Sequence, residues 1–401
     1  MSEAAHLPVG LVYDERLTAY NFGPSHPMQP SRLILTVELL RALDLLAEPG
    51  ACLLPFQPAT REELQLVHAG EYVDAVAALS ADPAAAQGRL RDQALRAGLT
   101  QGDNPVFRGV HEASALVAGA TLAGARAVMD GTVAHAFSVA GGLHHAHHDH
   151  AAGFCIYNDP AIAIAGVRQQ YGCRVAYVDV DAHHGDGVQE RFYDDPHVLT
   201  ISLHESGRYL FPGTGFVEET GEGAGYGYAA NLPLEPYTGD ELFLSAFRAV
   251  VPPLLRSFHP DLIVVEAGVD SHYTDPITHL ATTTNLWPPL IGELHGLAHE
   301  LCGGRLLVTG GGGYQPHTVA PRAWTLVFAA LRERVPLDDR LPPAWLTLCR
   351  RYAKGDVPQT LLDREALEIP ADYAEQITML TASTIRQLQR ELFPLHGLAP
   401  A

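Results

Sequence analysis

The chain has 401 residues, and its 47% hydrophobic and 18% charged content is enough for a large core and excludes a disordered protein. Its formal charge of −20 argues against nucleic-acid binding as the main activity. No apolar run reaches the ~18 residues of a membrane span, and no secretory signal opens the sequence, so we expect a soluble, cytoplasmic protein.

Short apolar runs alternate along the chain with longer Ala- and Leu-rich segments of helical period. The predicted strands are Val9–Tyr13, His135–Val139, Arg174–Val180, Val198–Ser202, Leu262–Glu266 and Arg305–Thr309. The predicted helices are Arg32–Leu46, Glu62–Val67, Val110–Met129, Pro160–Tyr171, Asp240–Leu255, Trp287–Cys302, His317–Leu331 and Tyr373–Leu392. This alternation indicates an α/β fold, a single domain whose mostly parallel central sheet is flanked by helices. We expect residues 1–335 to form the main domain, with residues 336–401 as a helical extension packed on it.

The most informative stretch is YVDVDAHHGDG, residues 177–187, in which an apolar strand ends in acids and histidines. Side chains of a strand alternate between its faces, so Asp179, Asp181 and His183 point the same way if the extended geometry persists. Two carboxylates and an imidazole at a strand end could bind a divalent metal. A polar turn that caps a helix near Gly187 would explain one or two of the acids, but not this repeat.

Polar side chains also follow three other predicted strands. His144 and His145 follow strand 135–139, Asp270 follows strand 262–266, and four glycines with Tyr314 follow strand 305–309. Open parallel sheets bind their ligands at the carboxyl ends of their strands. We therefore expect these four segments to converge on one crevice.

A catalytic metal needs about three protein ligands and an open position for water or substrate. Asp181, His183 and Asp270 supply two oxygens and one nitrogen, a donor set that suits zinc, iron(II), cobalt or manganese. A metal in such a site polarises a carbonyl and lowers the pKa of bound water towards neutrality.

The remaining polar residues have the chemistry of a hydrolase. His144 and His145 could transfer protons near neutral pH, with Asp179 and Asp186 as nearby carboxylates to fix their tautomers. Tyr314, carried on a flexible glycine run, could donate its hydroxyl to an oxyanion. Together these residues indicate metal-assisted hydrolysis of a carbonyl compound.

At these residues the sequence resembles the histone deacetylase family, the arginase-like metal-dependent deacetylases. The matching motifs are NFGPSHPMQPSR, GDNPVF, GGLHHA, GFCIYND, YVDVDAHHGDGV, SLH followed by FPGTG, AGVDSH and GGGGY, in the family's order. The segments GDNPVFRGVHEASAL and DSHYTDPITHL and the C-terminal extension look closest to the bacterial acetoin utilization branch. The resemblance implies an arginase/deacetylase-like fold with its catalytic domain in residues 1–335.

The resemblance also implies the reaction, in which an amidohydrolase removes acetyl from ε-N-acetyl-lysine of proteins or peptides through metal-activated water. Asp181, His183 and Asp270 match the family's zinc ligands, and Fe²⁺, Co²⁺ or Mn²⁺ could replace zinc.

The implied catalytic residues form two pairs and an oxyanion donor. His144 with Asp179 matches the first histidine of the family's tandem pair. His145 with Asp186 matches the second, which is usually assigned as general base and acid. Tyr314 matches the tyrosine that binds the acetyl carbonyl and its oxyanion.

The substrate positions follow from the same resemblance. Phe154 and Phe211 would form a slot for the aliphatic lysine stem, with Gly153 beside it, and Asp103 matches the rim aspartate that holds the substrate backbone. Ile277 lies at the pocket mouth, where the polyamine-selective branch has an acid, and this apolar residue counts against acetylpolyamines.

Two structural sites for K⁺ or Na⁺ are implied as well. The residues matched to the first are Asp179, Asp181, His183, Ser202 and Leu203, and those matched to the second are Phe192, Asp195, Val198 and Tyr228. His147, His148 and His150 extend beyond the family's motif; they could bind adventitious metal, but we favour a solvated loop.

Three other functions remain as alternatives. A related amidohydrolase could act on an acetylated small molecule such as an acetylpolyamine. A binuclear manganese ureohydrolase would need a DAHxD pattern and a second DxD pair, but Asp186 comes one residue too late and Asp270 is followed by His272. A non-catalytic binding protein of the same fold would have lost a ligand or a catalytic residue, and none is lost. The physiological substrate, the native metal and the oligomeric state stay open.

Overall fold

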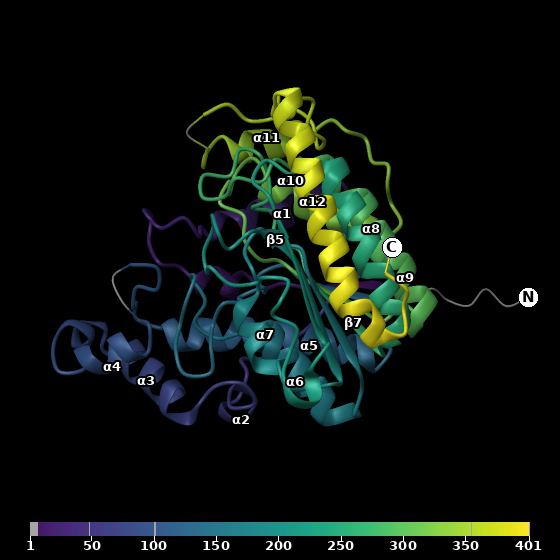
Figure 1. The fold of residues 1–401 in the computed structure, drawn as a ribbon. Helices are drawn as coiled ribbons and strands as arrows, with labels where there is room; N and C mark the ends of the chain where they lie inside the picture. Colours follow the sequence, from purple (N-terminus) through teal and green to yellow (C-terminus); the bar gives the residue numbers. More distant parts are fainter. Residues whose placement is uncertain (1–6, 48, 100–101, 354, 401) are drawn as a thin grey trace, which may run out of the picture.

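The computed structural model describes residues 7–47, 49–99, 102–353 and 355–400. Within these residues eight strands form one sheet in the order β2-β1-β3-β8-β7-β4-β5-β6, and every neighbouring pair is parallel (Figure 1). The strands are β1 Val9–Val12, β2 Ala51–Leu53, β3 His135–Ser138, β4 Val175–Asp179, β5 Val198–Glu205, β6 Ala229–Leu234, β7 Leu262–Glu266 and β8 Leu306–Thr309. The predicted α/β domain is confirmed, and its sheet is wholly parallel.

Helices cover both faces of this sheet (Figure 1). The α-helices are α1 Ser31–Ala42, α2 Arg61–Leu64, α3 Gly70–Ala81, α4 Arg91–Arg96, α5 Val110–Met129, α6 Asp159–Tyr171, α7 Asp186–Phe192, α8 Asp240–Phe258, α9 Trp287–Cys302, α10 Ala320–Leu331, α11 Pro343–Cys349 and α12 Ala371–Leu392. Short 3₁₀ helices are η1 Glu15–Ala19, η2 Pro83–Gln87, η3 Gly223–Gly225, η4 Thr284–Leu286 and η5 Phe393–His396. Helices α5 and α6 pack together, with α5 against β1 and β3, while α8 packs on β4 and β5 and α9 packs on β7.

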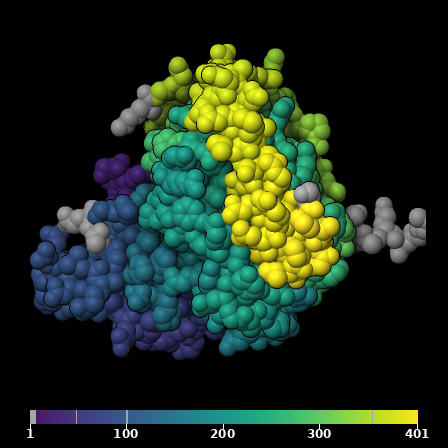
Figure 2. Space-filling view, viewed as in Figure 1, coloured from purple at the N-terminus to yellow at the C-terminus, as the bar shows by residue number. Residues whose placement is uncertain are grey.

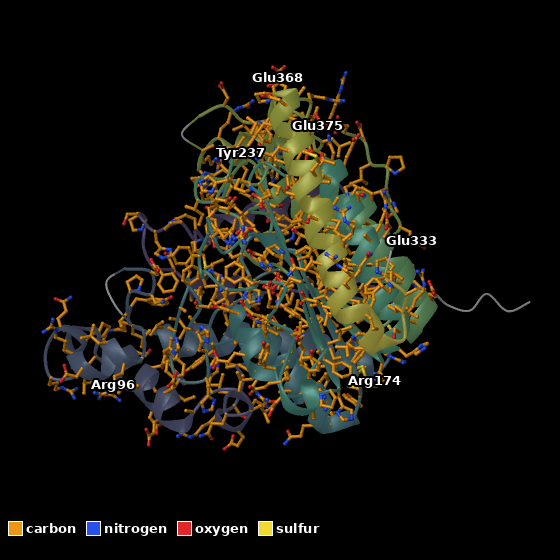
Figure 3. All side chains as sticks on the ribbon, viewed as in Figure 1. Arg96, Arg174, Tyr237, Glu333, Glu368 and Glu375 are labelled. Carbon is orange, nitrogen blue, oxygen red and sulfur yellow. The ribbon has the colours of Figure 1, made fainter. Side chains whose placement is uncertain are left out.

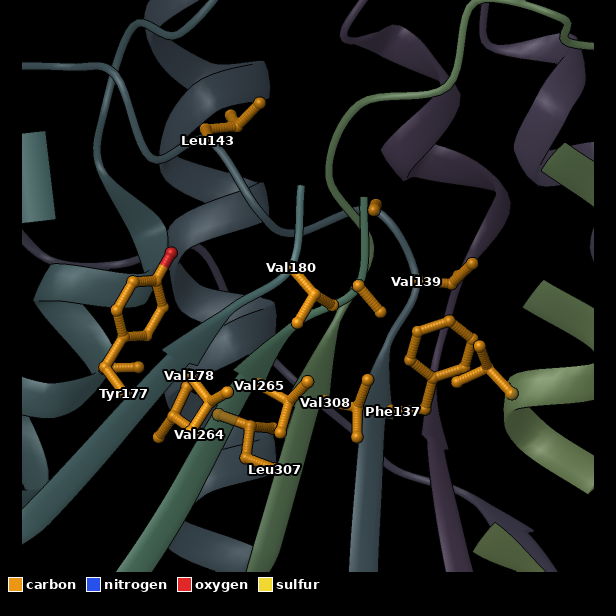
Figure 4. Close-up of a cluster of buried hydrophobic side chains, with 14 of the residues drawn as sticks. Phe137, Val139, Leu143, Tyr177, Val178, Val180, Val264, Val265, Leu307 and Val308 are labelled. Carbon is orange, nitrogen blue, oxygen red and sulfur yellow. The ribbon is translucent and has the colours of Figure 1, made fainter. Parts of the chain in front are cut away.

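The central strands form the core because both of their faces are covered. All five residues of β4 and of β7 are buried, and both strands lack the alternation of a half-exposed strand and carry an acid, Asp179 or Glu266, only at the last position. Figure 4 shows Val178 of β4, Val264 and Val265 of β7, and Val308 of β8 packed side by side. This layer holds the strand ends that carry the polar clusters in fixed positions.

Some predicted elements differ from the observed ones. Helices α5 and α9 and strand β7 have the predicted bounds, but strands β2 and β6 and helices α3, α4, α7 and α11 were not predicted. Strand β2 has only three residues, and β6 contains an asparagine and a proline, which are depleted in strands. Because β6 is at the edge of the sheet, its proline is tolerated there.

The C-terminal segment lies on the same body. Helix α12 packs against β6 and α8 and runs across the surface in yellow (Figures 1 and 2). Trp345 of α11 donates its Nε1–H to the carbonyl of Leu35 at 2.8 Å. The proposed division between residues 335 and 336 stays a prediction. No helix in the described residues combines the length and apolar character that crossing a membrane requires.

Candidate active site

The polar segments meet because their strands are neighbours. Strands β3, β8, β7 and β4 are consecutive in the sheet and parallel, so the loops that leave their carboxyl ends emerge at one edge. The glycine, histidine, aspartate and tyrosine clusters of the sequence follow these four strands. The predicted convergence therefore follows from the strand order, which the sequence does not show.

Asp181, His183 and Asp270 form one buried group whose ligand atoms all lie within 4.8 Å of one another. The Nδ1 of His183 is 2.8 Å from Oδ2 of Asp270 and 3.2 Å from Oδ1 of Asp181. Two carboxylates and one imidazole that converge on a point have the donor number and type of a divalent metal site with an open position. The donor set therefore fits the metal that the sequence predicts, but it does not identify the metal.

The glycine run after β8 lies against these ligands. The backbone N–H of Gly312 donates to Oδ2 of Asp181 at 2.7 Å, and a Cβ at this position would collide with Oδ2 of Asp270. The close backbone approach that four glycines predict is present, and it orients an acid that would bind the metal.

The two adjacent histidines have different carboxylate partners. The Nδ1 of His144 is 2.8 Å from Asp179, and the Nδ1 of His145 is 2.7 Å from Asp186. Their Nε2 atoms are 3.0 Å apart, so both rings face the same space. The predicted pairing of each histidine with its acid is what the geometry shows.

The surroundings of His144 and His145 shift their pKa values in opposite directions. Burial alone would lower the pKa of His144, but the charges of Asp179 and Glu266 raise it well above its ordinary value. Burial and the charge of His144 lower the pKa of His145 to about 4, against the opposing effect of Asp186. At neutral pH His145 is therefore the imidazole that can accept a proton, whereas the pKa of His144 is shifted in the opposite direction.

Tyr314 closes the site on the other side. Its ring centroid is 6.4 Å from that of His183 and 5.6 Å from that of Phe154. Its backbone N–H donates to Oδ2 of Asp275 at 2.9 Å, and Oδ1 of Asp275 accepts from the N–H of Ile277 at 3.1 Å. Asp275 thus joins the tyrosine loop to the loop after β7.

Aromatic rings lie around the approach to the site. The ring of Phe211 packs on His145 at 5.0 Å between centroids and is 44% exposed, so it extends from the catalytic group to the surface. Gly153, at φ +50°, fills the space between these two rings, and a Cβ there would be 3.0 Å from Phe211 and closer still to His145. Phe154 packs between Tyr314 and His26. All the predicted slot residues therefore adjoin the reacting groups.

The two predicted rim residues lie further out. Asp103 is exposed, and its carbonyl accepts from Nε2 of His26 at 3.1 Å, which links it to the ring of Phe154. Ile277 is partly buried on the loop held by Asp275. Neither touches the metal ligands.

The predicted monovalent-cation residues fall into two groups. Ser202 pairs with Asp179 across β5 and β4, directly beside the metal ligands, and Leu203 follows it. In the second group the carbonyl of Phe192 accepts from the N–H of Asp195, and the carbonyl of Asp195 accepts from Val198. The carbonyl of Tyr228 accepts from Thr200. These cation sites stay predictions.

Glu266 is a site residue that sequence reasoning missed. It is fully buried 3.6 Å from Nδ1 of His144, it accepts from Tyr177 and Thr309, and its Oε1 has no hydrogen-bond partner in the described residues. Burial and the charges of Asp179 and Asp181 raise its pKa well above its ordinary value. An acid as the last residue of an apolar strand was the available signal.

Asp159 is a second residue that the sequence analysis did not single out, because the GFCIYND motif that it ends does not by itself indicate a role for the acid. Its carboxylate accepts from the backbone N–H groups of Gly142 and Leu143 and from Thr121. It thereby holds the loop that carries the tandem histidines.

The interpretation of His147 as part of a solvated loop is wrong. Its Nε2 is 3.3 Å from Oδ2 of Asp186, and its Nδ1 pairs with Glu190. His148 is exposed, and its ring Nδ1 bonds to the carbonyl of Val67. His147 is therefore part of the hydrogen-bond network around Asp186 and His145, which a sequence pattern cannot show because Glu190 lies on α7, more than 40 residues along the chain.

Comparisons with known proteins agree with this geometry. The family model described as "Histone deacetylase domain" matches residues 26–331. The chain belongs to the histone deacetylase family, and its fold and site define a deacetylase of that family.

Within the family the chain lies in the acetoin utilization branch. It is 41% identical over 375 residues to acetoin utilization protein AcuC of Bacillus subtilis, which covers 93% of this chain and 95% of that protein. It is also 41% identical over 364 residues to AcuC of Staphylococcus xylosus, covering 90% and 92%.

Solved structures show the same fold. A crystal structure of an HDAC homolog from Aquifex aeolicus matches with a TM-score of 0.80 and 29% identity, covering 93% of this chain and 99% of that one. A crystal structure of an HDAC homolog complexed with SAHA matches with a TM-score of 0.80 and 28% identity, covering 94% and 99%.

Proposed function

We propose that the protein is a zinc-dependent lysine deacetylase that removes acetyl groups from ε-N-acetyl-lysine in proteins or peptides. The observation that carries the proposal is the convergence of three candidate metal donors, the imidazole of His145 and the ring of Tyr314 beside the aromatic residues Phe154 and Phe211. The enzyme would be cytoplasmic, with no nucleic-acid or membrane partner.

The chain's own residues account for the proton transfers and the positioning. Asp181, His183 and Asp270 would hold the metal, which supplies polarisation of the acetyl carbonyl and a lowered pKa for bound water. His145, neutral at physiological pH, takes a proton from the attacking water at its Nε2 and returns it to the departing lysine amine. The Tyr314 hydroxyl donates to the oxygen that gains negative charge.

The neighbouring carboxylates hold the two histidines in position. Asp186 accepts from Nδ1 of His145, which leaves Nε2 free to accept a proton. Asp179 pairs with Nδ1 of His144 and raises its pKa, so a protonated His144 would add positive charge beside the developing oxyanion. K⁺ or Na⁺ in the two sites named above would fix the backbone around β4 and β5.

The slot supports acetyl-lysine over a free acetylpolyamine. Phe154 and Phe211 offer apolar surface that suits the neutral methylene stem of acetyl-lysine. Ile277 provides no charge for the distant ammonium of a polyamine, and an unpaired ammonium in an apolar site is costly. Outside the slot the substrate backbone could bond to Asp103, which is exposed.

The test compares kcat/KM for an acetyl-lysine peptide and for N-acetylputrescine, with the metal content of the same sample determined. We expect the peptide to be the better substrate and activity to follow bound zinc. Asp103→Ala should reduce turnover of the peptide more than that of a minimal acetyl-lysine analogue. Faster turnover of N-acetylputrescine would reject the protein-lysine proposal and favour a small-molecule amidohydrolase.

A further inference from the structure

Three histidines lie near the amino ends of the strands, whereas the active site lies at their carboxyl ends. His135 is the first residue of β3, whereas the active-site loops leave the carboxyl ends of the strands. His295 and His299 lie four residues apart on α9 and so share one face of that helix. Each of the three rings offers a nitrogen within 4.8 Å of the others, and the ring centroids are 4.6 to 5.3 Å apart.

His135 carries the observation that distinguishes this cluster from ordinary packing. It is 3% exposed, and its Nδ1 is buried without a hydrogen-bond partner in the described residues. A buried polar atom with no partner is costly unless a ligand satisfies it.

Gly304, which follows α9, leaves room for the cluster, since a Cβ there would be 2.9 Å from Cε1 of His299.

The cluster opens into a surface cleft. His299 is exposed, and the three histidines line the cleft together with Leu331, Arg332 and Glu333. The charge of Glu333 acts on His295, and Figure 3 labels this acid on the side of the molecule where α9 lies. Arg332, the cation in the cleft, is engaged with the carbonyl of Leu45. An ion could therefore enter from solvent and receive a carboxylate or water as its fourth ligand.

We infer that His135, His295 and His299 form a second divalent metal site of the zinc class, separate from the catalytic one. Three imidazoles with a fourth position for Glu333 or water are a donor set that suits zinc in a tetrahedral site. The ion would join the C-terminal turns of α9 to the first residue of β3. Its role would be structural, because the acetyl-lysine site is at the other end of these strands.

The test uses zinc alone as the probe. Metal-free protein is titrated with Zn²⁺ by calorimetry, and bound zinc is counted after removal of excess. We expect two equivalents in the wild type and one in His299→Ala, with unchanged deacetylation by that variant. Loss of a direct ligand should weaken the second equivalent by at least about 100-fold, beyond the 10- to 100-fold cost of losing an outer partner.

Two further variants complete the design. Asp181→Asn should lose the catalytic equivalent and retain the one at the cluster, which separates this proposal from the proposed function. His197→Ala removes an exposed histidine outside the cluster and should still bind two. His299 is exposed, so its variant should fold, and the melting curve of the metal-free protein checks this. One equivalent in both wild type and His299→Ala, or two in both, would overturn the proposal.

Discussion

His145 and His144 are adjacent in sequence, yet their surroundings shift their pKa values in opposite directions. Asp179 and Glu266 raise the pKa of His144, whereas burial and the neighbouring His144 lower the pKa of His145 despite its contact with Asp186. We predict that His145→Ala lowers kcat by at least about 10²-fold, the lower end for general acid–base catalysis, and retains its metal. His144→Ala should be less damaging. Single-turnover rates with metal analysis test this, and a larger loss in His144→Ala would reverse the assignment.

Tyr314 is the proposed donor to the oxyanion. Removing one such donor costs about 10²–10³ in kcat in other enzymes. Tyr314→Phe keeps the ring that packs on Phe154 and His183, so we expect kcat to fall by this amount with little change in KM. Steady-state kinetics on the acetyl-lysine peptide measure both constants. A variant with wild-type kcat would show that the ring acts by packing alone.

The Nε2 of His147 lies 3.3 Å from Oδ2 of Asp186, and we expect this contact to hold the acid in position for its bond to His145. Outer partners of this kind are worth about 10- to 100-fold, and we predict a loss within that range in kcat for His147→Gln, with metal retained. His148→Gln is the control, because its ring contacts neither Asp186 nor Glu190 among the described residues. Equal rates in the two variants would remove His147 from the network.

The same histidine predicts a pH dependence of stability. Burial lowers the pKa of His147, but hydrogen bonds to Asp186 and Glu190 raise it from 6.5 to about 10. Its ion pairs therefore contribute fully below pH 6.5 and are lost as the pH rises towards 10. The Tm of the wild type should fall over this window, and the Tm of His147→Gln should fall less. Parallel curves would contradict the prediction.

At the scale of elements, one acid joins three of them. Asp363, in the segment between α11 and α12, accepts from His272 in the loop after β7, from Thr284 of η4 and from Arg322 of α10. Burial would raise the pKa of Asp363, but the hydrogen bond from His272 and the charge of Arg322 lower it. The C-terminal segment is therefore fixed beside the metal-site loop by a charged group.

This junction predicts acid sensitivity. A carboxyl group whose pKa is lowered in the fold stabilises the protein above its ordinary value of 3.8 and loses that effect as the pH falls below it. Asp363→Asn should lower the Tm at neutral pH, and its difference from wild type should shrink on acidification. Asp356→Asn changes an exposed acid of the same segment and serves as control. A constant difference at all pH values would reject the charge-based account.

For the whole molecule, metal and fold are coupled. Asp181 and Asp270 are both buried, so removal of a bound cation leaves two neighbouring carboxylates without a compensating positive charge from the ion. An ion at 100 times its dissociation constant stabilises a fold by about 2.7 kcal/mol. We predict that chelation lowers the Tm by several degrees and that zinc restores it. The measurement uses the His299→Ala variant, in which we expect only the catalytic ion to bind. The Tm of the double variant His299→Ala/Asp181→Asn should not change on chelation or on addition of zinc.

The fold class and the candidate residues of the site could be predicted from the sequence. Apolar runs and helical periods are local, so β7, α5 and α9 were predicted with their observed bounds. The metal and acid–base candidates were predictable because each follows a strand directly, and parallel strands present their carboxyl ends at one edge.

The distant groups that surround each candidate residue were visible only in the three-dimensional arrangement. The raised pKa of His144 depends on Asp179 at the end of β4 and on Glu266 from the neighbouring strand β7, and the lowered pKa of His145 depends on its burial beside His144. The link from His147 to Glu190 and the meeting of His135 with α9 are contacts between separate elements. A pKa or a ligand set depends on neighbours within a few ångströms in space, and residues far apart in the sequence carry no local pattern that reports such a neighbour.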